Sequence, residues 1–300
     1  MEQVAMNRSF PHWPLSHVAA ALVALIGCRQ AAEAPPTNVV IRQVASLPSE
    51  PSDPAWRQAV EFDAKLIPQD MVEPRLLAES TAGVRVRALT DGRDLAVRLE
   101  WDDASKDDVP GPAKFFDACA IQVPADVQST VPAPQMGETG RPVHISYWNA
   151  VWQASVDGRP DSLAALYPNA AVDHYPFEAE SLKKDPAAQQ AMAARYAPAR
   201  TLGNPMAGPR ESPVEDMIAE GPSTLTRSPE QASRGRGVKT ATGWSVQIVR
   251  PLPASAANHQ PGQIAFAVWR GDAREVGARK MRTAWIELSQ EEIHEPSASQ

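Results

Sequence analysis

The sequence has only two cysteines in 300 residues, Cys28 and Cys119, and its six histidines are scattered. No cluster of Cys and His residues has the spacing of a zinc site. Cys119 stands in an apolar segment after Asp117, a setting typical of a buried and unreactive thiol. If Cys28 is used at the N-terminus, as argued below, Cys119 has no partner, which excludes an internal disulfide.

The chain also lacks basic runs with interleaved aromatic residues, and its formal net charge is −7. This balance disfavours nucleic acid as a partner. No Gly-x-Ser-x-Gly or His-Glu-x-x-His motif is present, and no pair of carboxylates stands out by spacing. An independent hydrolase is therefore not indicated.

Long apolar runs are absent, and the longest, residues 18–27, is too short to cross a bilayer. Its length and the preceding Arg8 are typical of the core of a signal peptide. The run ends in Leu25-Ile26-Gly27-Cys28, which resembles the lipobox of bacterial lipoproteins. We therefore predict an exported, periplasmic lipoprotein that is lipidated on Cys28 and tethered to a membrane. The alternative is a plain secretory signal with an incidental cysteine.

What the chain does have is a series of short strand patterns separated by turns, together with 29 prolines. The clearest pair is 84–89 and 94–101 around the turn Asp91-Gly92, which predicts a hairpin with arginines facing water. Further strands are predicted at 118–123, 143–150, 243–250, 263–270 and 283–289. This series predicts a mainly β fold, an antiparallel β-sandwich with a few short helices.

The predicted organisation is one domain with flanking segments. It comprises a signal peptide at 1–27, a flexible tether at 28–50, the sandwich at 51–290 and a disordered tail at 291–300. An insertion of helix and loop is expected at about 178–212, where residues 181–197 are rich in Ala, Gln, Lys and Glu. Residues 213–220 are predicted to be a short helix capped by Ser212.

Two further groups of residues have mainly structural interpretations. Six tryptophans are assigned to core and sheet packing, namely Trp56, Trp101, Trp148, Trp244, Trp269 and Trp285. The acidic run 102–108 does not have the spacing of an EF-hand loop, so a solvated hairpin end is predicted there.

Nine segments, kept in order over residues 53–289, together resemble one known family. They are DPAW (53–56), LAVRLEWDD (95–103), FDACAIQVP (116–124), MG (136–137), PVHI (142–145), AEGPSTLT (219–226), GWSVQIVRPL (243–252), IAFAVWRG (264–271) and KMRTAWIEL (280–288). Their succession is similar to the haem b-binding gamma subunits of periplasmic molybdenum enzymes of the dimethyl-sulfoxide-reductase group. Members include the gamma subunits of ethylbenzene dehydrogenase, selenate and chlorate reductases, and dimethylsulfide dehydrogenase.

The resemblance implies that a methionine and a lysine hold the haem iron, and by position these are Met136 and Lys280. The flanking Arg279 and Arg282 are candidates for pairing with the haem propionates. Haem b would be bound non-covalently, because neither cysteine begins a Cys-x-x-Cys-His motif. His144 and Lys239 are rival iron ligands, whereas His174 is assigned to a loop.

The function implied is electron transfer without catalysis by this chain. The implied partners are a molybdopterin catalytic subunit, an iron–sulfur subunit, and a c-type cytochrome or quinone-linked carrier. The alternatives are a haem-free ligand-binding sandwich of the carbohydrate-binding or DOMON type, and an anchoring lipoprotein. Pro222-Ser223 stands where the family usually has Phe-Gly, a departure that leaves a haem-free member open.

Overall fold

The computed structural model describes residues 36–127, 130–160, 163–169, 183–204 and 210–291. The N-terminal unit, Met1–Ala34, lies outside these ranges, so the predictions for the signal peptide and Cys28 are not addressed by the structure. His174 also lies outside the described residues.

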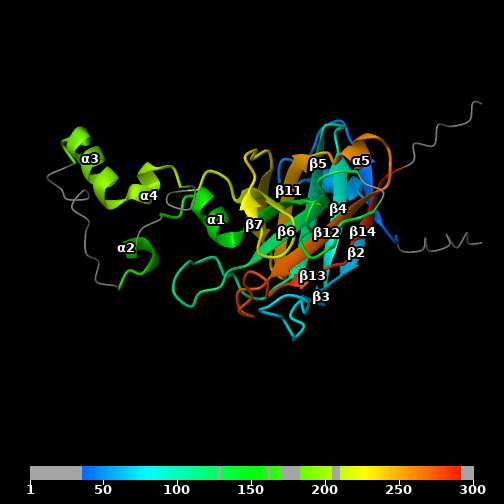
Figure 1. The fold of residues 1–300 in the computed structure, drawn as a ribbon, viewed down its shortest axis with the longest axis horizontal. Helices are drawn as coiled ribbons and strands as arrows, with labels where there is room; N and C mark the ends of the chain where they lie inside the picture. The colour runs from blue at the N-terminus through cyan, green and yellow to red at the C-terminus, as the bar shows by residue number, and fades with distance from the viewer. Residues whose placement is uncertain (1–35, 128–129, 161–162, 170–182, 205–209, 292–300) are drawn as a thin grey trace, which may run out of the picture. The chain divides into compact units, whose positions relative to one another are not determined.

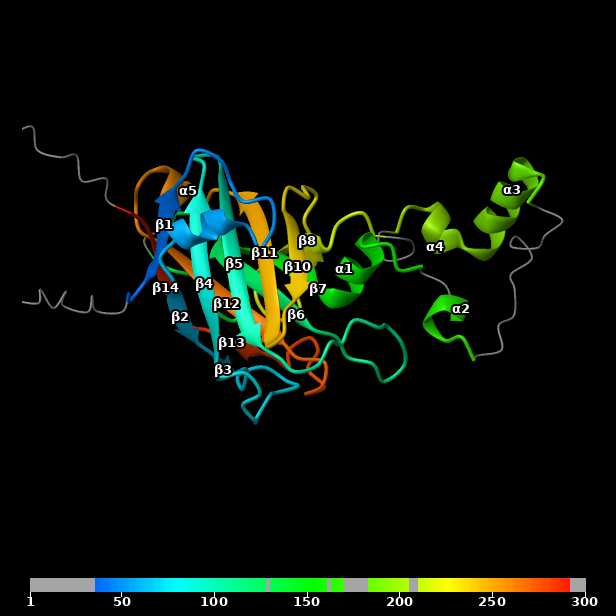
Figure 2. The same ribbon diagram turned by 180° about the vertical axis from the view of Figure 1, so that it is seen from behind.

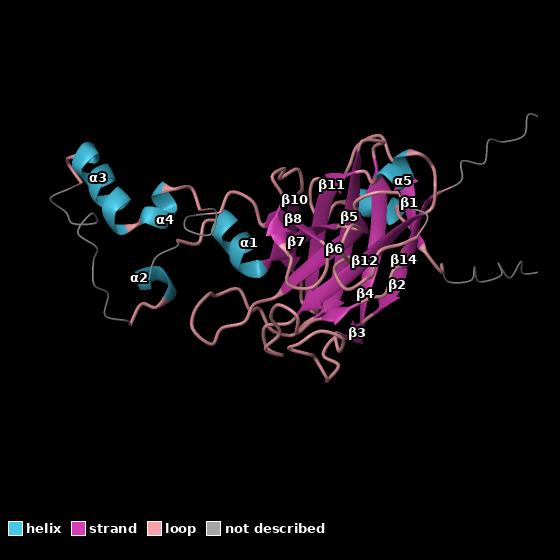
Figure 3. Cartoon of the chain, viewed as in Figure 1, coloured by secondary structure: helices cyan, strands magenta, loops and turns pink. Residues whose placement is uncertain are grey.

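The described chain is built around one continuous sheet of 14 strands (Figure 3). The strands are β1 (Val39–Gln43), β2 (Phe62–Lys65), β3 (Ile67–Pro68), β4 (Gly83–Thr90), β5 (Asp94–Asp102), β6 (Ala118–Pro124), β7 (Val143–Asn149), β8 (Val214–Ala219), β9 (Thr226–Arg227), β10 (Arg234–Lys239), β11 (Gly243–Pro251), β12 (Gly262–Trp269), β13 (Met281–Arg282) and β14 (Ile286–Gln290). The main strand order is β10-β11-β5-β4-β1-β14-β12-β6-β7-β8-β9.

The sheet folds on itself along β12, which pairs with β14 through residues 262–264 and with β6 through residues 265–269. One layer thus holds β10, β11, β5, β4, β1 and β14, seen in front in Figure 2. The other layer holds β12, β6, β7 and β8, seen from the opposite side in Figure 1. The prediction of a β-sandwich is confirmed.

The core lies between the two layers and contains side chains from both, including Leu99 of β5, Ile121 of β6 and Val268 of β12, each fully buried. Trp148 contacts Trp101 and Trp244 edge to face, with ring centroids 6.4 and 5.1 Å apart. Burial of such large apolar surfaces is the main stabilising contribution to the sandwich.

The first strand, β1, contradicts the predicted tether at 28–50 and the purely antiparallel sheet. It pairs in parallel with both β4 and β14, and Val39 and Ile41 are buried in the core. Glu291, assigned to the disordered tail, donates its N–H to the carbonyl of Ile41. The local pattern at 39–43 is too short to predict a strand, and its formation depends on two partners far away in the sequence.

Residues 214–219 form β8 rather than the predicted helix. This strand pairs with β7 in the register Val143↔Ala219 to Trp148↔Val214. The Ser212 hydroxyl does accept a hydrogen bond from the Val214 N–H, at 3.2 Å, but at a strand rather than a helix start. The strand is favoured because the edge of β7 supplies hydrogen bonds along the whole segment.

The hairpin of β4 and β5 is confirmed, but its arginines do not all face water. The 3₁₀ helix η1 (Pro54–Gln58) covers the face of the hairpin that bears Arg87 and Arg98. Arg87 donates to the carbonyl of Trp56. The guanidinium of Arg98 lies 5.4 Å from the centroid of the Trp56 ring. A second small core therefore forms outside the sandwich, from Trp56, Ala59, Leu89, Ala96 and Val249.

The acidic run 102–108 is also less solvated than predicted, because Asp103 is only 2% exposed. Asp117 lies nearby without any exposure and accepts hydrogen bonds from Trp244 Nε1 and from the N–H of Gly271. Burial raises the pKa of Asp117 to about 7 in spite of these bonds. The segment is therefore part of the folded domain, not a free hairpin end.

The remaining helices are short: α1 (Ala150–Val156), α2 (Leu163–Leu166), α3 (Pro186–Tyr196), α4 (Pro198–Thr201) and α5 (Ala254–Ala257). The prediction of helix within 181–197 is confirmed for residues 186–196 by α3, which is capped by Asp185 and has no buried residue. None of the described helices combines the length and apolarity needed to cross a membrane.

Candidate functional site

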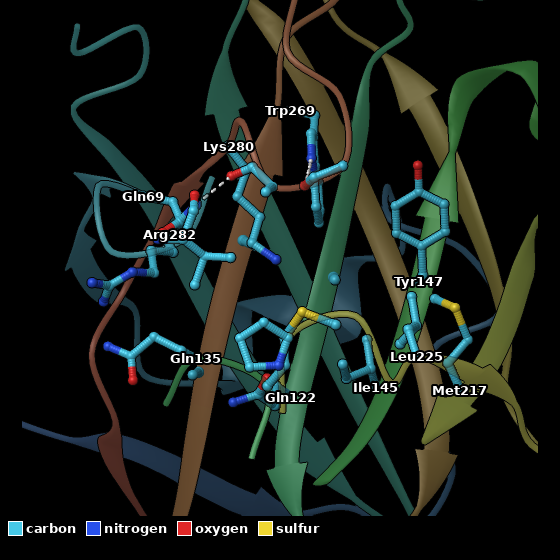
Figure 4. A pocket seen from close by; sticks show the side chains of 18 of the residues that line it. Gln69, Gln122, Gln135, Ile145, Tyr147, Met217, Leu225, Trp269, Lys280 and Arg282 are labelled. Atoms are coloured by element: carbon cyan, nitrogen blue, oxygen red, sulfur yellow. Dashed lines mark hydrogen bonds between the residues drawn. The ribbon is translucent and has the colours of Figure 1, made fainter. Parts of the chain in front are cut away.

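A cavity of about 550 Å³ opens on the outer face of β6, β7 and β12, away from the core (Figure 4). Its floor includes Ala120, Ala265 and Ala267, which alternate along their strands with core residues such as Ile121 and Phe266. Because alanine side chains are short, this part of the sheet is flat and apolar. The volume falls within the range typical of cofactor and small-molecule sites.

Four connecting segments form the walls around this floor. They are residues 69–73, 134–136, 222–225 and 277–283. Trp269, Tyr147 and Trp152 add aromatic surface, with Tyr147 edge to face against both tryptophans at centroid distances of 5.4 and 5.5 Å. The site is thus assembled from distant parts of the chain on one face of one layer.

Lys280 extends its amine into the cavity, as Figure 4 shows. Its Nζ lies 5.1 Å from the centroid of the Trp269 ring and has no hydrogen-bond or ion-pair partner among the described residues. Burial, and to a lesser degree the charge of Arg282, lowers the pKa of the Lys280 amine to about 8. A lysine in this state releases its proton readily and can then donate its lone pair to a metal.

Met136 lines the same cavity and packs against the apolar cluster that includes Ala120, Ala267 and Trp269. Its backbone φ of 68° and that of Gly137, 77°, place two consecutive residues in the left-handed region. A side chain at Gly137 would lie 2.8 Å from the carbonyl oxygen of Arg141, so glycine is required there. This turn explains why glycine follows Met136.

The loop that carries Met136 is held on the sheet by side chains. Gln122 Nε2 donates to the carbonyl of Pro134 at 3.1 Å, and Trp285 Nε1 donates to that of Pro132 at 2.7 Å. The carbonyl of Met136 itself accepts from the N–H of Gly221 at 2.8 Å. The backbone from which the Met136 side chain extends therefore has a fixed position on the wall.

Of the two predicted arginines, Arg282 lines the cavity and Arg279 does not. Arg282 is 9% exposed, and its Nε has no hydrogen-bond partner among the described residues. Figure 4 shows its guanidinium turned away from the amine of Lys280. A buried guanidinium with a free donor is a suitable partner for a carboxylate.

The two described rival ligands do not line the cavity. His144 lies between Val143 and Ile145 on β7, so its side chain projects from the opposite face of the strand. Lys239 donates to the carbonyl of Asp103 at 2.7 Å instead. No three His, Cys, Asp or Glu side chains come together as a metal-binding group within the ranges that the structure describes.

Several cavity residues were not predicted from the sequence, above all Gln69, Tyr147 and Trp152. Gln69 carries no local signal of such a role, since it follows the short strand β3 in a connecting loop. Pro222 and Ser223, the departure from the family pattern, both line the cavity.

The sequence model of a family described as ethylbenzene dehydrogenase matches residues 53–281. The chain belongs to this family. The match takes in nearly the whole described sandwich, including the segments that bear Met136 and Lys280. It leaves out β1 and β14, which precede and follow the matched residues in the sequence and pair with each other in the middle of the sheet.

One relative of this chain is a protein of Haloferax mediterranei, which is provisionally named respiratory nitrate reductase heme subunit ORF7. The two are 25% identical over 271 residues, which is 87% of this chain and 74% of the relative.

Solved structures give only distant matches. A family 9 carbohydrate-binding module from Caldicellulosiruptor kristjanssonii in complex with cellotriose aligns over 88% of this chain and 98% of its own, with 8% identity and a TM-score of 0.40. The glucose complex of such a module gives 9% identity and a TM-score of 0.36, over 87% and 100% of the two chains. At these scores the likeness carries no argument about the ligand of this cavity.

Proposed function

We propose that this chain is a haem-binding electron-transfer subunit of a molybdenum oxidoreductase complex. The observation that carries the proposal is that Met136 and Lys280, 144 positions apart in the sequence, line one apolar cavity. In this proposal the thioether and the free amine are the two protein ligands of the iron, and the haem is of the b type, held non-covalently.

The residues of the cavity fit this group. The alanine floor and the aromatic side chains suit a flat, apolar macrocycle, and the unpartnered Nε of Arg282 suits a propionate. The Lys280 amine has no competing partner among the described residues, and its pKa of about 8 allows it to bind as the neutral base. Haem bound here would supply reversible one-electron exchange, with a potential set by its axial ligands and surroundings.

If Met136 and Lys280 both held the iron, no position on it would be left open for a substrate. We therefore propose that the chain is not itself catalytic and serves a partner that carries out the reaction. The relative provisionally named as a nitrate reductase heme subunit supports a catalytic molybdoenzyme as this partner. An iron–sulfur subunit on one side and a c-type cytochrome or quinone-linked carrier on the other complete the proposed chain of electron transfer.

The proposed location is the periplasm, with the protein attached to a membrane through lipid on Cys28. This part of the proposal rests on the N-terminal sequence pattern alone.

The test is an absorbance spectrum of the protein exported to a periplasm that is supplied with haem. We expect a six-coordinate, low-spin b-type spectrum from the wild type. Met136→Ala and Lys280→Ala are each expected to lose the low-spin bands, because each removes one ligand and leaves the iron five-coordinate or unbound.

Matched variants make the result specific to these two residues. Met217→Leu removes the other described methionine of the lining, and Lys239→Ala removes the rival lysine. Both are expected to remain low-spin. A wild type that stays haem-free under ample haem would overturn the proposal and leave a haem-free binding or anchoring sandwich.

A further inference from the structure

Lys280 stands at the end of a connection whose last five residues, 276–280, have few anchors of their own. This connection runs from β12 to β13, and its Val276 is 48% exposed. Within residues 276–280, Arg279 N–H bonds the carbonyl of Val276, at 3.0 Å. The other described hydrogen bonds to residues 276–280 come from outside this segment. Trp269 Nε1 donates to the carbonyl of Gly277 at 3.0 Å, and further bonds come from Gln69.

Gln69 is only 3% exposed, and both the nitrogen and the oxygen of its side-chain amide are hydrogen-bonded. Its Nε2 donates to the carbonyls of Val72, at 2.7 Å, and Ala278, at 2.9 Å. Its Oε1 accepts from the N–H groups of Met71, at 2.8 Å, and Val72, at 2.7 Å. A buried amide with complete hydrogen bonding holds its neighbours in one arrangement, since every alternative leaves polar groups unpaired.

The backbone of Gln69 adds a bond to the lysine itself. The N–H of Gln69 donates to the carbonyl of Lys280 at 2.9 Å, a contact drawn in Figure 4. Residue 69 thus binds the backbone at 278 through its side chain and at 280 through its main chain. The same side chain shapes the turn that presents Val72 and Glu73 to the cavity.

We infer that Gln69 is a positioning residue for the Lys280 amine, an inference that rests on the proposed function. Four rotatable bonds separate the amine from its backbone, and no partner among the described residues fixes the amine itself. The position that the amine takes in the cavity is therefore set by the position of the Lys280 backbone and by the adjoining walls. Gln69 helps to fix the Lys280 backbone and the walls, because it joins the wall of residues 69–73 to the wall of residues 277–283.

The variant that isolates this role is Gln69→Glu, which has nearly the same shape. A glutamate still accepts from Met71 and Val72, but it places a negative oxygen against the carbonyls of Val72 and Ala278. The side-chain link between the two walls is lost, while the main-chain bond to Lys280 and the acceptor of the local turn remain. The matched control is Gln247→Glu, because Gln247 is also 3% exposed and its Nε2 donates to the carbonyl of Pro48 at 2.7 Å, away from the cavity lining.

The first measurement uses haem-free protein and follows hydrogen exchange by mass spectrometry. In Gln69→Glu we expect exchange over residues 66–80 and 274–283 to be about ten-fold faster than in the wild type, as loss of a buried hydrogen-bond network allows local opening. Gln247→Glu is expected to leave these two segments unchanged.

The second measurement is the spectrum of the haem-loaded proteins. Gln69→Glu is expected to convert a substantial share of the low-spin signal to high-spin, whereas Gln247→Glu stays low-spin even if its melting temperature falls. A wild type without haem would overturn the proposed function, and the exchange experiment would still decide the role of Gln69 in the loop. Unchanged exchange and an unchanged spectrum in Gln69→Glu would overturn the inference.

If Gln69→Glu does not fold, the same two measurements on Gln69→Met decide the matter. Methionine keeps the length of the side chain without its donor or acceptor and brings no charge into the site.

Discussion

At the scale of single residues, Lys280 shows how surroundings change chemistry. A lysine near a strand end is ordinarily a solvated cation, but here its amine faces alanine and tryptophan and lies near another positive charge. The pKa of Lys280 falls from 10.5 to about 8. The rival ligand His144 lies on the far face of β7, outside the cavity. The iron-binding role proposed for the lysine depends on this shift, since only the neutral amine donates a lone pair.

This shift predicts a pH dependence of stability in the haem-free protein. Between about pH 8 and 10.5 the unfolded chain holds a proton on Lys280 that the folded chain has released. The free energy of unfolding therefore rises with pH across this window, by up to about 3 kcal/mol from this group. Below pH 8 both states hold the proton, so the buried charge lowers the free energy of unfolding by its full amount.

Urea unfolding of the wild type and Lys280→Met at pH 7.5, 9 and 10.5 measures this effect. The difference between the two proteins removes the contribution of other groups, such as Arg250, whose pKa burial lowers to about 10. The stabilities are expected to converge or cross as the pH rises. Parallel pH profiles would contradict the lowered pKa.

At the scale of elements, β1 and β8 are strands because of their neighbours. β1 lies between β4 and β14 and pairs in parallel with both, so its short pattern is completed by partners that follow much later in the chain. β8 was predicted to be a helix but extends along the edge of β7. Through β7 and β8 the sheet presents Tyr147 and Met217 to the cavity.

The buried position of β1 predicts that its residues matter for stability. Ile41→Ala is expected to lower the free energy of unfolding by about 2–4 kcal/mol, because it leaves a cavity in the core between the layers. Val40→Ala, at a partly exposed neighbour, is expected to cost less than about 1 kcal/mol. Urea unfolding compares the two, and equal small losses would show that residues 39–43 are dispensable.

At the scale of the whole molecule, the sandwich separates support from function. The core between the layers holds the fold together, while the cavity lies on the outer face of one layer under loops from four parts of the chain. Such an arrangement leaves the proposed haem site near the surface of the domain and outside its core. The proposed lipid on Cys28 would keep the protein near the membrane.

Replacing Cys28 tests the anchor. In fractionated bacterial cells the wild type is expected with the membranes and Cys28→Ala in the soluble periplasm, with the same haem spectrum in both. Cys119→Ala is the matched control, since Cys119 is the other cysteine and is buried in the core. It should remain with the membranes. Membrane association of Cys28→Ala equal to the wild type would argue against lipidation at this position.

The sequence by itself determined the strand periodicity, the Asp91-Gly92 hairpin and the family resemblance. The periodicity and the hairpin predicted the sandwich class, because alternation and turn residues are local properties of the chain. Met136 and Lys280 were predicted only through the family resemblance. Only the tertiary structure decided which side chains share the cavity. Strand register selects the face on which Ala120, Tyr147 and Trp269 lie, and Gln69 reaches Lys280 across more than 200 residues. Such contacts leave no local pattern in the sequence, and so β1, Gln69 and the burial of Asp103 could be seen only in the folded protein.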